Sequence, residues 1–377
     1  MGIRADTTSS LADQLFNAES VNELSTAVGR AYKPFKVTTF SRIVLREFPK
    51  LALKERINCL VQALTKYLPN DFERVVDILE RALPAPLDPT LSDDDFGQFI
   101  WVVPGEYVAK HGCRKEYLQQ SLAFLKAATM RFSSEAAVRP FLRDFPDQTM
   151  AFVHDCAMHD NYHVRRLASE GIRPYLPWAL RVRIDVAQVI EVLTRLHADR
   201  TRYVTRSVAN TLNDLSKDGP ELVIRTLRDW RRRECQESNE LAWMTGHALR
   251  TLINTGHAGA LETLGYPTQP AFRLSGIRLA REVLVGGNLE WSASLRSERD
   301  QRLRIALRVY FLKANGSHIA KVFSVKNIGL QAGQSLQLRK RLSFRPITTR
   351  ALYLGVHHVE LLVNGVARGK RSFILMQ

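Results

Sequence analysis

The sequence is poor in cysteine and lacks the short motifs of metal, nucleotide and hydride chemistry. Its four cysteines lie far apart and form no CxxC pair: Cys59, Cys113, Cys156 and Cys235. Neither a disulfide framework nor a zinc site is therefore expected, and free thiols fit a reducing compartment. No HExxH, GxxxxGKS/T, GxSxG or GxGxxG pattern occurs. Nothing in the chain therefore indicates a metal hydrolase, an NTPase or a dehydrogenase.

Long apolar runs are missing as well. Nowhere do about 18 apolar residues follow one another, so no membrane-spanning helix is expected. The first residues contain neither an apolar core nor a cleavage-site pattern, so we expect no secretory signal. These features predict a cytoplasmic protein.

Acidic residues are fewer than basic ones. Lys and Arg number 54 and Asp and Glu 38, which gives a net charge of +16 at pH 7. Such an excess indicates a polyanionic partner, most simply nucleic acid. An anionic membrane is the rival partner, but no long helix combines a basic face with an apolar one. Solubility alone is the third explanation of the charge.

Residues from about 9 to 265 predict helices, because apolar residues recur there at helical spacing. In the segment 75–83, for example, apolar side chains can share one face. Asn70 or Asp71 can cap that helix, and Pro84 ends it.

A repeat emerges in segments that begin at Asn161, Thr201 and Glu240. Val164 in the first segment corresponds to Val204 in the second. The period of about 40 residues is the length of a HEAT-type helix pair. Such units bury their apolar faces by stacking into a solenoid with a concave binding surface.

The pattern changes near Leu274, where apolar and polar residues begin to alternate. Turn pairs recur at Gly286-Gly287, Asn315-Gly316, Ala332-Gly333 and Asn364-Gly365. About 100 residues with about seven short strands predict an immunoglobulin-like sandwich. The predicted fold is therefore a mainly α, HEAT-like solenoid over 1–268, followed by an all-β sandwich over 269–377. A linker at 266–270 joins them.

The segment MRFSSEAAVRPFL, which begins at Met130, contains the first candidate carboxylate. Ser133 or Ser134 can cap the next helix, with Glu135 in its first turn. An acid there interacts favourably with the helix dipole by about 0.3–1 kcal/mol, so a structural role is enough to explain it.

The segment NYHVRRLASEGIRPYLPW, which begins at Asn161, contains the second group of candidates. Arg166 and Glu170 are four residues apart and share a helix face. They form either a surface ion pair of under about 1 kcal/mol or a phosphate-facing arginine whose acid positions it or faces the sugar. Trp178 lies in the turn between helices, where it can pack or stack on a nucleotide.

The third segment carries a polar, basic stripe at helical spacing, formed by Arg206, Asn210, Asn213 and Lys217. Such a stripe suits a DNA backbone, although a solvated helix face is the commoner explanation. Its recurrence in successive repeats favours a track along DNA, with Asp214 beside it.

Together, SSEAAVRPFL, HDNYHVRRLASEGIRPYLPW and VANTLNDLSKDGPE resemble the AlkC/AlkD superfamily of bacterial alkylpurine DNA glycosylases. The tail from VKNIGLQAGQ to VNG resembles the immunoglobulin-like extension of one AlkC branch. The resemblance implies hydrolysis of the N-glycosidic bond of cationic bases in duplex DNA, notably 3-methyladenine and 3-methylcytosine, with the lesion left in the stack. It implies no metal or organic cofactor, and a nucleoid-associated bacterial monomer.

The resemblance also assigns residues. The catalytic group it implies is Glu135, Glu170, Trp178 and Asp214. The DNA-binding group we expect is Arg139, His163, Arg165, Arg166, Arg206, Asn210, Asn213 and Lys217. A methylated base is already positively charged and leaves without protonation. A carboxylate and an aromatic face then stabilise the charge that develops on the sugar.

Two alternatives stay open. A basic helical-repeat scaffold that binds nucleic acid or protein without catalysis would fit the same composition, because such repeats more often bind than catalyse. The sandwich either helps to encircle the duplex or is a stabilising appendage. The encircling role would use its basic residues Arg339, Lys340, Arg341, Arg345 and Arg350.

Overall fold

The computed structural model describes residues 10–93, 95–346 and 351–377, so Arg350 lies outside the described residues. The chain forms two compact units. The first contains the residues up to Asp214 together with Cys235–Glu237, and the second contains Leu215–Glu234 and Ser238–Gln377. The domain boundary predicted at 268/269 stays a prediction.

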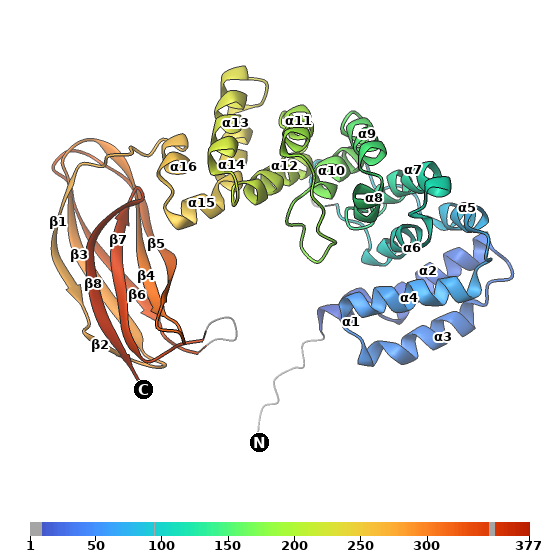
Figure 1. The fold of residues 1–377 in the computed structure, drawn as a ribbon, viewed down its shortest axis with the longest axis horizontal. Coiled ribbons are helices and arrows are strands. Elements are labelled where there is room, and N and C mark those ends of the chain that lie inside the picture. Colours follow the sequence, from blue (N-terminus) through green and yellow to red (C-terminus); the bar gives the residue numbers. More distant parts are fainter. Residues whose placement is uncertain (1–9, 94, 347–350) are drawn as a thin grey trace. The chain divides into compact units, whose positions relative to one another are not determined.

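The described part of the first unit is helical, as predicted (Figure 1). Its α-helices are α1 (Leu11–Leu15), α2 (Ala18–Ala31), α3 (Val37–Glu47), α4 (Leu53–Tyr67), α5 (Phe72–Ala82), α6 (Val102–Gly112), α7 (Leu118–Thr129), α8 (Arg139–Asp144), α9 (Pro146–Ala157), α10 (Tyr162–Gly171), α11 (Val186–Leu196) and α12 (Arg202–Leu215). Three 3₁₀ turns, η1 (Phe48–Lys50), η2 (Phe99–Trp101) and η3 (Lys115–Tyr117), precede α4, α6 and α7.

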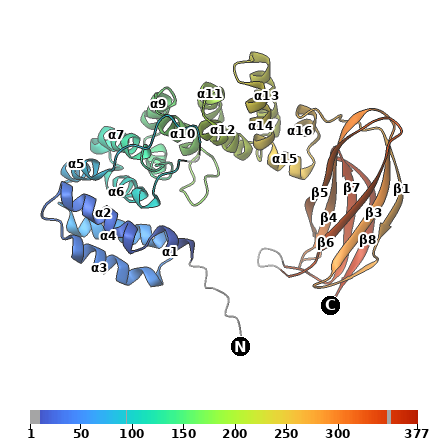
Figure 2. The same cartoon turned by 180° about the vertical axis from the view of Figure 1, so that it is seen from behind.

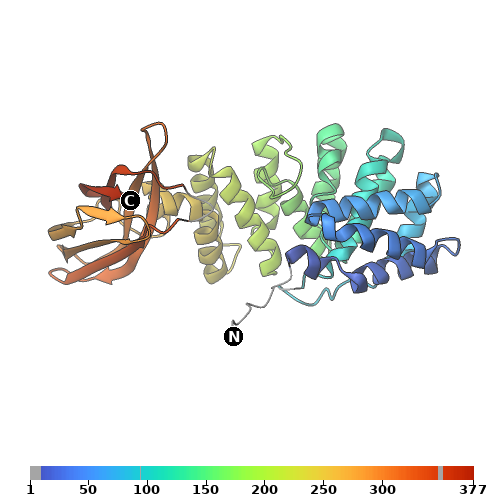
Figure 3. The ribbon, with the colours of Figure 1, turned by 90° about the horizontal axis from the view of Figure 1, so that it is seen from below.

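These helices pack largely against their neighbours in the chain, as Figure 3 shows from blue to green. α2 packs on α3 and α5, and α10 packs on α9 and α11. Side-chain caps fix where several helices begin. Asp71 accepts a 3.3 Å hydrogen bond from the backbone N–H of Arg74, which confirms one of the two caps predicted for α5. Asn161 caps α10 in the same way, at 2.9 Å from the N–H of His163.

The predicted helix start beside Glu135 is wrong. Residues 135–138 form a turn, and α8 begins only at Arg139, without a side-chain cap. The N–H of Ser134 donates to the Thr129 hydroxyl at 3.3 Å. Glu135 therefore lies in an irregular turn that packs against other helices, and not in the first turn of a helix.

The second unit contains α13 (Pro220–Arg233), α14 (Ser238–Ala248), α15 (Arg250–Thr255) and α16 (Ala258–Thr263). Its strands are β1 (Phe272–Leu279), β2 (Glu282–Leu284), β3 (Asn288–Ser297), β4 (Gln301–Leu312), β5 (His318–Leu330), β6 (Ser335–Ser343), β7 (Gly355–Val363) and β8 (Val366–Met376). The described residues thus contain eight strands where about seven were predicted.

The strands form two sheets, in the orders β1-β3-β6 and β2-β8-β7-β4-β5 (Figure 2). Alternate side chains of both sheets fill one buried apolar core, which includes Trp291, Leu307 and Phe373. The predicted Asn364-Gly365 hairpin is confirmed, because Val363 pairs with Val366. Asn364 and Gly365 have φ values of 48° and 82°, as a two-residue turn of this kind requires.

Asn364 also connects the sandwich to the rest of the second unit. Its side chain is fully buried, accepts from the N–H of Arg304 at 2.8 Å and donates to the carbonyl of Pro267 at 3.0 Å. A Cβ at Gly365 would lie 2.2 Å from the carbonyl oxygen of Gly256. The hairpin turn therefore packs directly against the segments that flank α16.

Among the described residues, no helix combines the length and the apolar character needed to cross a membrane.

Candidate functional site

Glu170 is at the centre of a buried polar network in the first unit. Only 4% of the residue is exposed. Its carboxylate accepts from Arg173 and, at 2.7 Å, from the Ser207 hydroxyl on α12. Arg166 Nη2 lies 3.8 Å from the same carboxylate. The i, i+4 pair predicted from the sequence forms, but it is buried and not a surface ion pair.

Arg166 links this network to the turn before α8. Its Nη1 donates to the Ser133 hydroxyl at 2.7 Å and to Glu135 Oε2 at 3.3 Å. The guanidinium also stacks on Tyr203, with Cζ 4.5 Å from the ring centroid. These contacts fix Arg166 both from the turn before α8 and from α12. A quarter of the Glu135 side chain remains exposed, at 25%.

Arg173 joins Glu170 to Asp214, although it was not among the predicted site residues. Its Nε donates to Asp214 Oδ2 at 3.0 Å. Asp214 is buried at the end of α12, and Arg173 follows α10. The structure therefore brings together three of the four predicted catalytic side chains, Glu135, Glu170 and Asp214. The spacing of three residues between Glu170 and Arg173 was the only sequence signal for this link.

Burial and neighbouring charges shift the pKa values of the carboxyl groups in different directions. Burial, reinforced by the nearby charge of Glu170, raises the pKa of Glu135. Burial opposes ionisation of Glu170 too, but the guanidinium groups of Arg166 and Arg173 lower its pKa below the usual range. A further acid, Glu106 on α6, was not predicted. Its pKa is raised by burial and by the charge of Glu135, although Lys54 partly offsets this.

Trp178, the fourth predicted catalytic residue, lies in the loop between α10 and α11 with 70% of the residue exposed. Its backbone is left-handed, with φ at 61°. The Lys54 ammonium on α4 donates to the Trp178 carbonyl oxygen. Farther along the loop, Arg139 donates to the carbonyl oxygen of Leu180.

Three predicted DNA-binding side chains instead make contacts inside the protein. Arg139 is fully buried and also donates to the carbonyl of Gly171 at 2.7 Å. Arg165 forms a two-pronged ion pair with Asp199, at 2.5 and 3.1 Å. His163 is 4% exposed, and burial lowers its pKa to about 4, so it is uncharged at neutral pH. Direct contact of Arg139, Arg165 or His163 with DNA finds no support in this geometry.

The predicted basic stripe is only partly on the surface. Arg206 pairs with Asp93 and keeps 33% of its side chain exposed. Asn210 is half-buried, Asn213 is buried, and Lys217 is exposed beyond the end of α12. The four residues therefore do not form one continuous solvated face.

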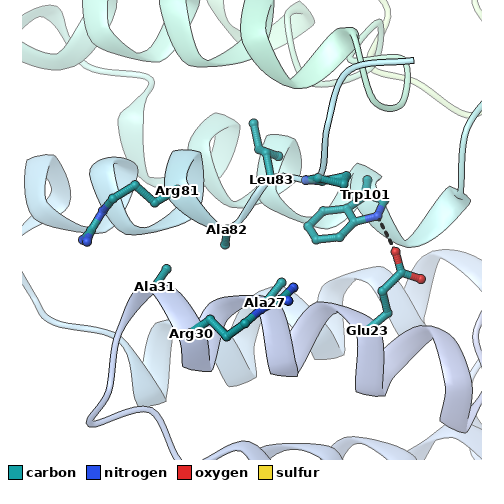
Figure 4. A pocket seen from close by; sticks show the side chains of 9 residues that line it. Glu23, Ala27, Arg30, Ala31, Arg81, Ala82, Leu83 and Trp101 are labelled. Carbon is teal, nitrogen blue, oxygen red and sulfur yellow. Dashed lines mark hydrogen bonds between the residues drawn. The ribbon is translucent and has the colours of Figure 1, made fainter. Parts of the chain in front are cut away.

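No group of three His, Cys, Asp or Glu side chains within the described ranges is placed to hold a metal ion. A separate pocket of about 430 Å³ lies between α2 and α5 (Figure 4). Trp101 donates there to Glu23 at 3.0 Å, and Arg30 on α2 and Arg81 on α5 also line the pocket. None of the predicted site residues lines it.

Comparison with known proteins connects this chain to a family. Residues 273–377 match the family described as "Uncharacterised protein YhaZ, C-terminal Ig-like domain". The chain is 30% identical to "Uncharacterized protein YhaZ" of Bacillus subtilis (strain 168) over 365 residues, which cover 96% of this chain and 98% of that protein.

A solved structure extends the likeness to three dimensions. It is that of the Pseudomonas fluorescens alkylpurine DNA glycosylase AlkC, bound to DNA that contains an abasic-site analog. The TM-score is 0.83 at 30% identity, and the match covers 98% of this chain and 100% of that one. The chain therefore belongs to the AlkC family, in the branch with a C-terminal immunoglobulin-like domain.

Proposed function

We propose that this protein is a monofunctional DNA glycosylase of base-excision repair, which hydrolyses the N-glycosidic bond of cationic N3-alkylated bases in duplex DNA. The observation that carries the proposal is Glu135, a partly exposed carboxylate fixed by the half-buried Arg166 in a chain of net charge +16. The AlkC structure supports it, because an abasic site is what base removal leaves in DNA. 3-Methyladenine and 3-methylcytosine are the substrates we propose.

The proposed chemistry assigns different tasks to the carboxylates. The cationic base leaves without protonation, and positive charge builds up on the deoxyribose. Glu135, the more exposed acid, stabilises that charge and orients the attacking water. Glu170 and Asp214 are buried and occupied by arginines, so they hold Arg166 and Arg173 in place. The exposed Trp178 ring adds cation–π stabilisation at the sugar.

The finer features follow the same proposal. Successive packed helices support a HEAT-like solenoid whose repeats present Glu135 and Trp178 to DNA. In this proposal the lesion stays in the stack during excision, as the resemblance to AlkC-type proteins implies. Arg206 and Lys217 are the remaining accessible candidates for the DNA backbone. We propose a monomer acting on the nucleoid of a bacterial cytoplasm.

A non-catalytic scaffold for nucleic acid or protein is the second candidate. The ion pairs of Glu170 and Asp214 with Arg166 and Arg173 favour it, because a non-catalytic fold can use buried contacts of this kind for stability alone. It predicts salt-dependent DNA binding without release of any base.

The test is single-turnover base release from a duplex with one 3-methylcytosine. We expect release by the wild-type protein and a loss of at least about a hundredfold in Glu135→Gln, the scale of one positioned electrostatic group. Glu116→Gln, which changes an exposed acid on η3, is the matched control and should match the wild type. Tight, salt-sensitive binding with no release by any variant would instead establish the scaffold.

A further inference from the structure

The loop that carries Trp178 is held through its backbone by two cations from distant helices. Lys54 on α4 lies 124 residues earlier in the chain and donates to the carbonyl of Trp178 itself. Arg139 on α8 donates to the carbonyl of Leu180, two residues farther on. The Trp178 residue is 70% exposed, so packing of the ring does not fix its direction.

The conformation of Trp178 needs such support. A left-handed backbone at a residue other than glycine, here with φ at 61°, is unfavourable and persists where surrounding contacts determine it. The carbonyl that Lys54 binds belongs to this same residue. If the contact were lost, the peptide could rotate toward the ordinary helical or extended regions, and the indole would then point elsewhere.

We propose that Lys54 is a positioning residue for Trp178, which fixes the backbone so that the indole ring is presented to the nucleotide. This inference rests on the proposed glycosylase function. Lys54 lies on an N-terminal helix, outside the three motif segments, and α4 packs on α6. The carboxyl group of Glu106 on α6 interacts electrostatically with the Lys54 ammonium. This attraction favours a Lys54 side chain that stays on the side of α4 that faces Glu106.

The competing role for Lys54 is a direct contact with a DNA phosphate, because the residue is exposed. The two roles differ in what they change. A phosphate contact adds to affinity and raises the salt dependence of binding by about one counterion. A positioning contact changes the rate of the bound complex and leaves the salt dependence of binding unchanged.

The experiment compares Lys54→Met and Lys54→Arg with Lys115→Met, which removes an exposed charge on η3. We expect Lys54→Met to lower the single-turnover rate at saturating protein about tenfold, since a displacement of about 1 Å in an active site can cost up to about a hundredfold in rate. Lys54→Arg, which can still donate to the carbonyl, should recover most of the rate, and Lys115→Met should match the wild type. The slope of DNA affinity against salt should be the same in all of them.

A double-mutant cycle shows whether Lys54 acts through Trp178. In a Trp178→Ala background, Lys54→Met should slow excision less than about twofold, because residues that act through one contact are not additive. The proposal is overturned if the tenfold loss persists in that background. It is also overturned if Lys54→Met weakens binding, lowers the salt slope by about one and leaves the saturated rate unchanged.

A second readout does not require base release. It therefore tests the positioning role of Lys54 even if the absence of base release has already refuted the proposed function. Subtracting the emission of Trp178→Phe from that of the parent chain isolates the signal of Trp178. Acrylamide quenching of this difference signal should change when Lys54→Met is present in both chains. Unchanged quenching would overturn the positioning role in an active or an inactive protein.

Discussion

Arg166 on α10 donates to Glu135 in the turn before α8, with 3.3 Å between Nη1 and Oε2. The same guanidinium lies 3.8 Å from Glu170, so one cation compensates two carboxylates that are both mostly shielded from water. Removing it leaves two like charges close together with little solvent around them, which is among the costlier single changes in a protein.

Arg166→Met should therefore destabilise the protein by about 3 kcal/mol in urea unfolding at pH 7. Arg143→Met removes an exposed pair with Asp144 and should cost under about 1 kcal/mol. If both variants lose the same small amount, the buried network does not contribute to stability as inferred.

Excision should depend on pH through Glu135, whose pKa is raised by burial. The reaction needs the carboxylate form, so the single-turnover rate should fall as pH drops through a pKa above the ordinary value for Glu of about 4.3. The measurement is the rate between about pH 4.5 and 8. Glu135→Gln should be slow and flat across this range. A wild-type profile that is also flat would argue against Glu135 as the group that must be ionised.

His163 should make the fold sensitive to acid. Its pKa is about 4 in the folded protein against about 6.5 unfolded, so only the unfolded chain takes up the proton between these values. Stability should fall as pH drops from about 6.5 toward 4, by up to about 3 kcal/mol. His163→Phe keeps a ring between Tyr162 and Tyr203 and should remove this part of the pH dependence of unfolding. An unchanged slope in the variant would contradict the assignment.

Asn364→Ala should destabilise the second unit by about 2 kcal/mol, because it removes a buried amide that hydrogen-bonds one backbone N–H and two part-buried carbonyls. Asn315→Ala, in an exposed hairpin turn, is the control and should cost less than about half as much. Thermal unfolding followed by circular dichroism measures both. Equal losses would mean that only the turn, and not the buried side-chain contacts, matters at Asn364.

Patterns of local spacing predicted the fold well. Apolar periodicity predicted the helices, alternation predicted the strands, and Asn364-Gly365 predicted its hairpin, because each depends on residues close together in the chain. The i, i+4 contact of Arg166 and Glu170 was predicted for the same reason.

What spacing could not predict was which polar side chains are buried and which distant residues meet. Arg139 was expected on DNA, yet its donors bind backbone carbonyls more than 30 residues away in the chain. Lys54 and Glu106 lie outside the motif segments, and only the packing of α4 on α6 brings them toward the site. The sequence does not distinguish a lysine or arginine that holds a loop from one that binds a phosphate.

The contacts of Asn364 and Gly365 with the segments around α16 limit how the sandwich can be lost or exchanged during evolution. The sandwich cannot be removed without exposing the helices beside it. A gene truncated after Pro270 would expose the surfaces of α15 and α16 that the sandwich covers, both apolar and polar. Recombination that exchanges the sandwich would have to carry α13–α16 with it, since these helices share its compact unit. Descendants without the sandwich would need more polar side chains on the surfaces of those last helices that the sandwich covers here. Shorter relatives can be searched for such substitutions.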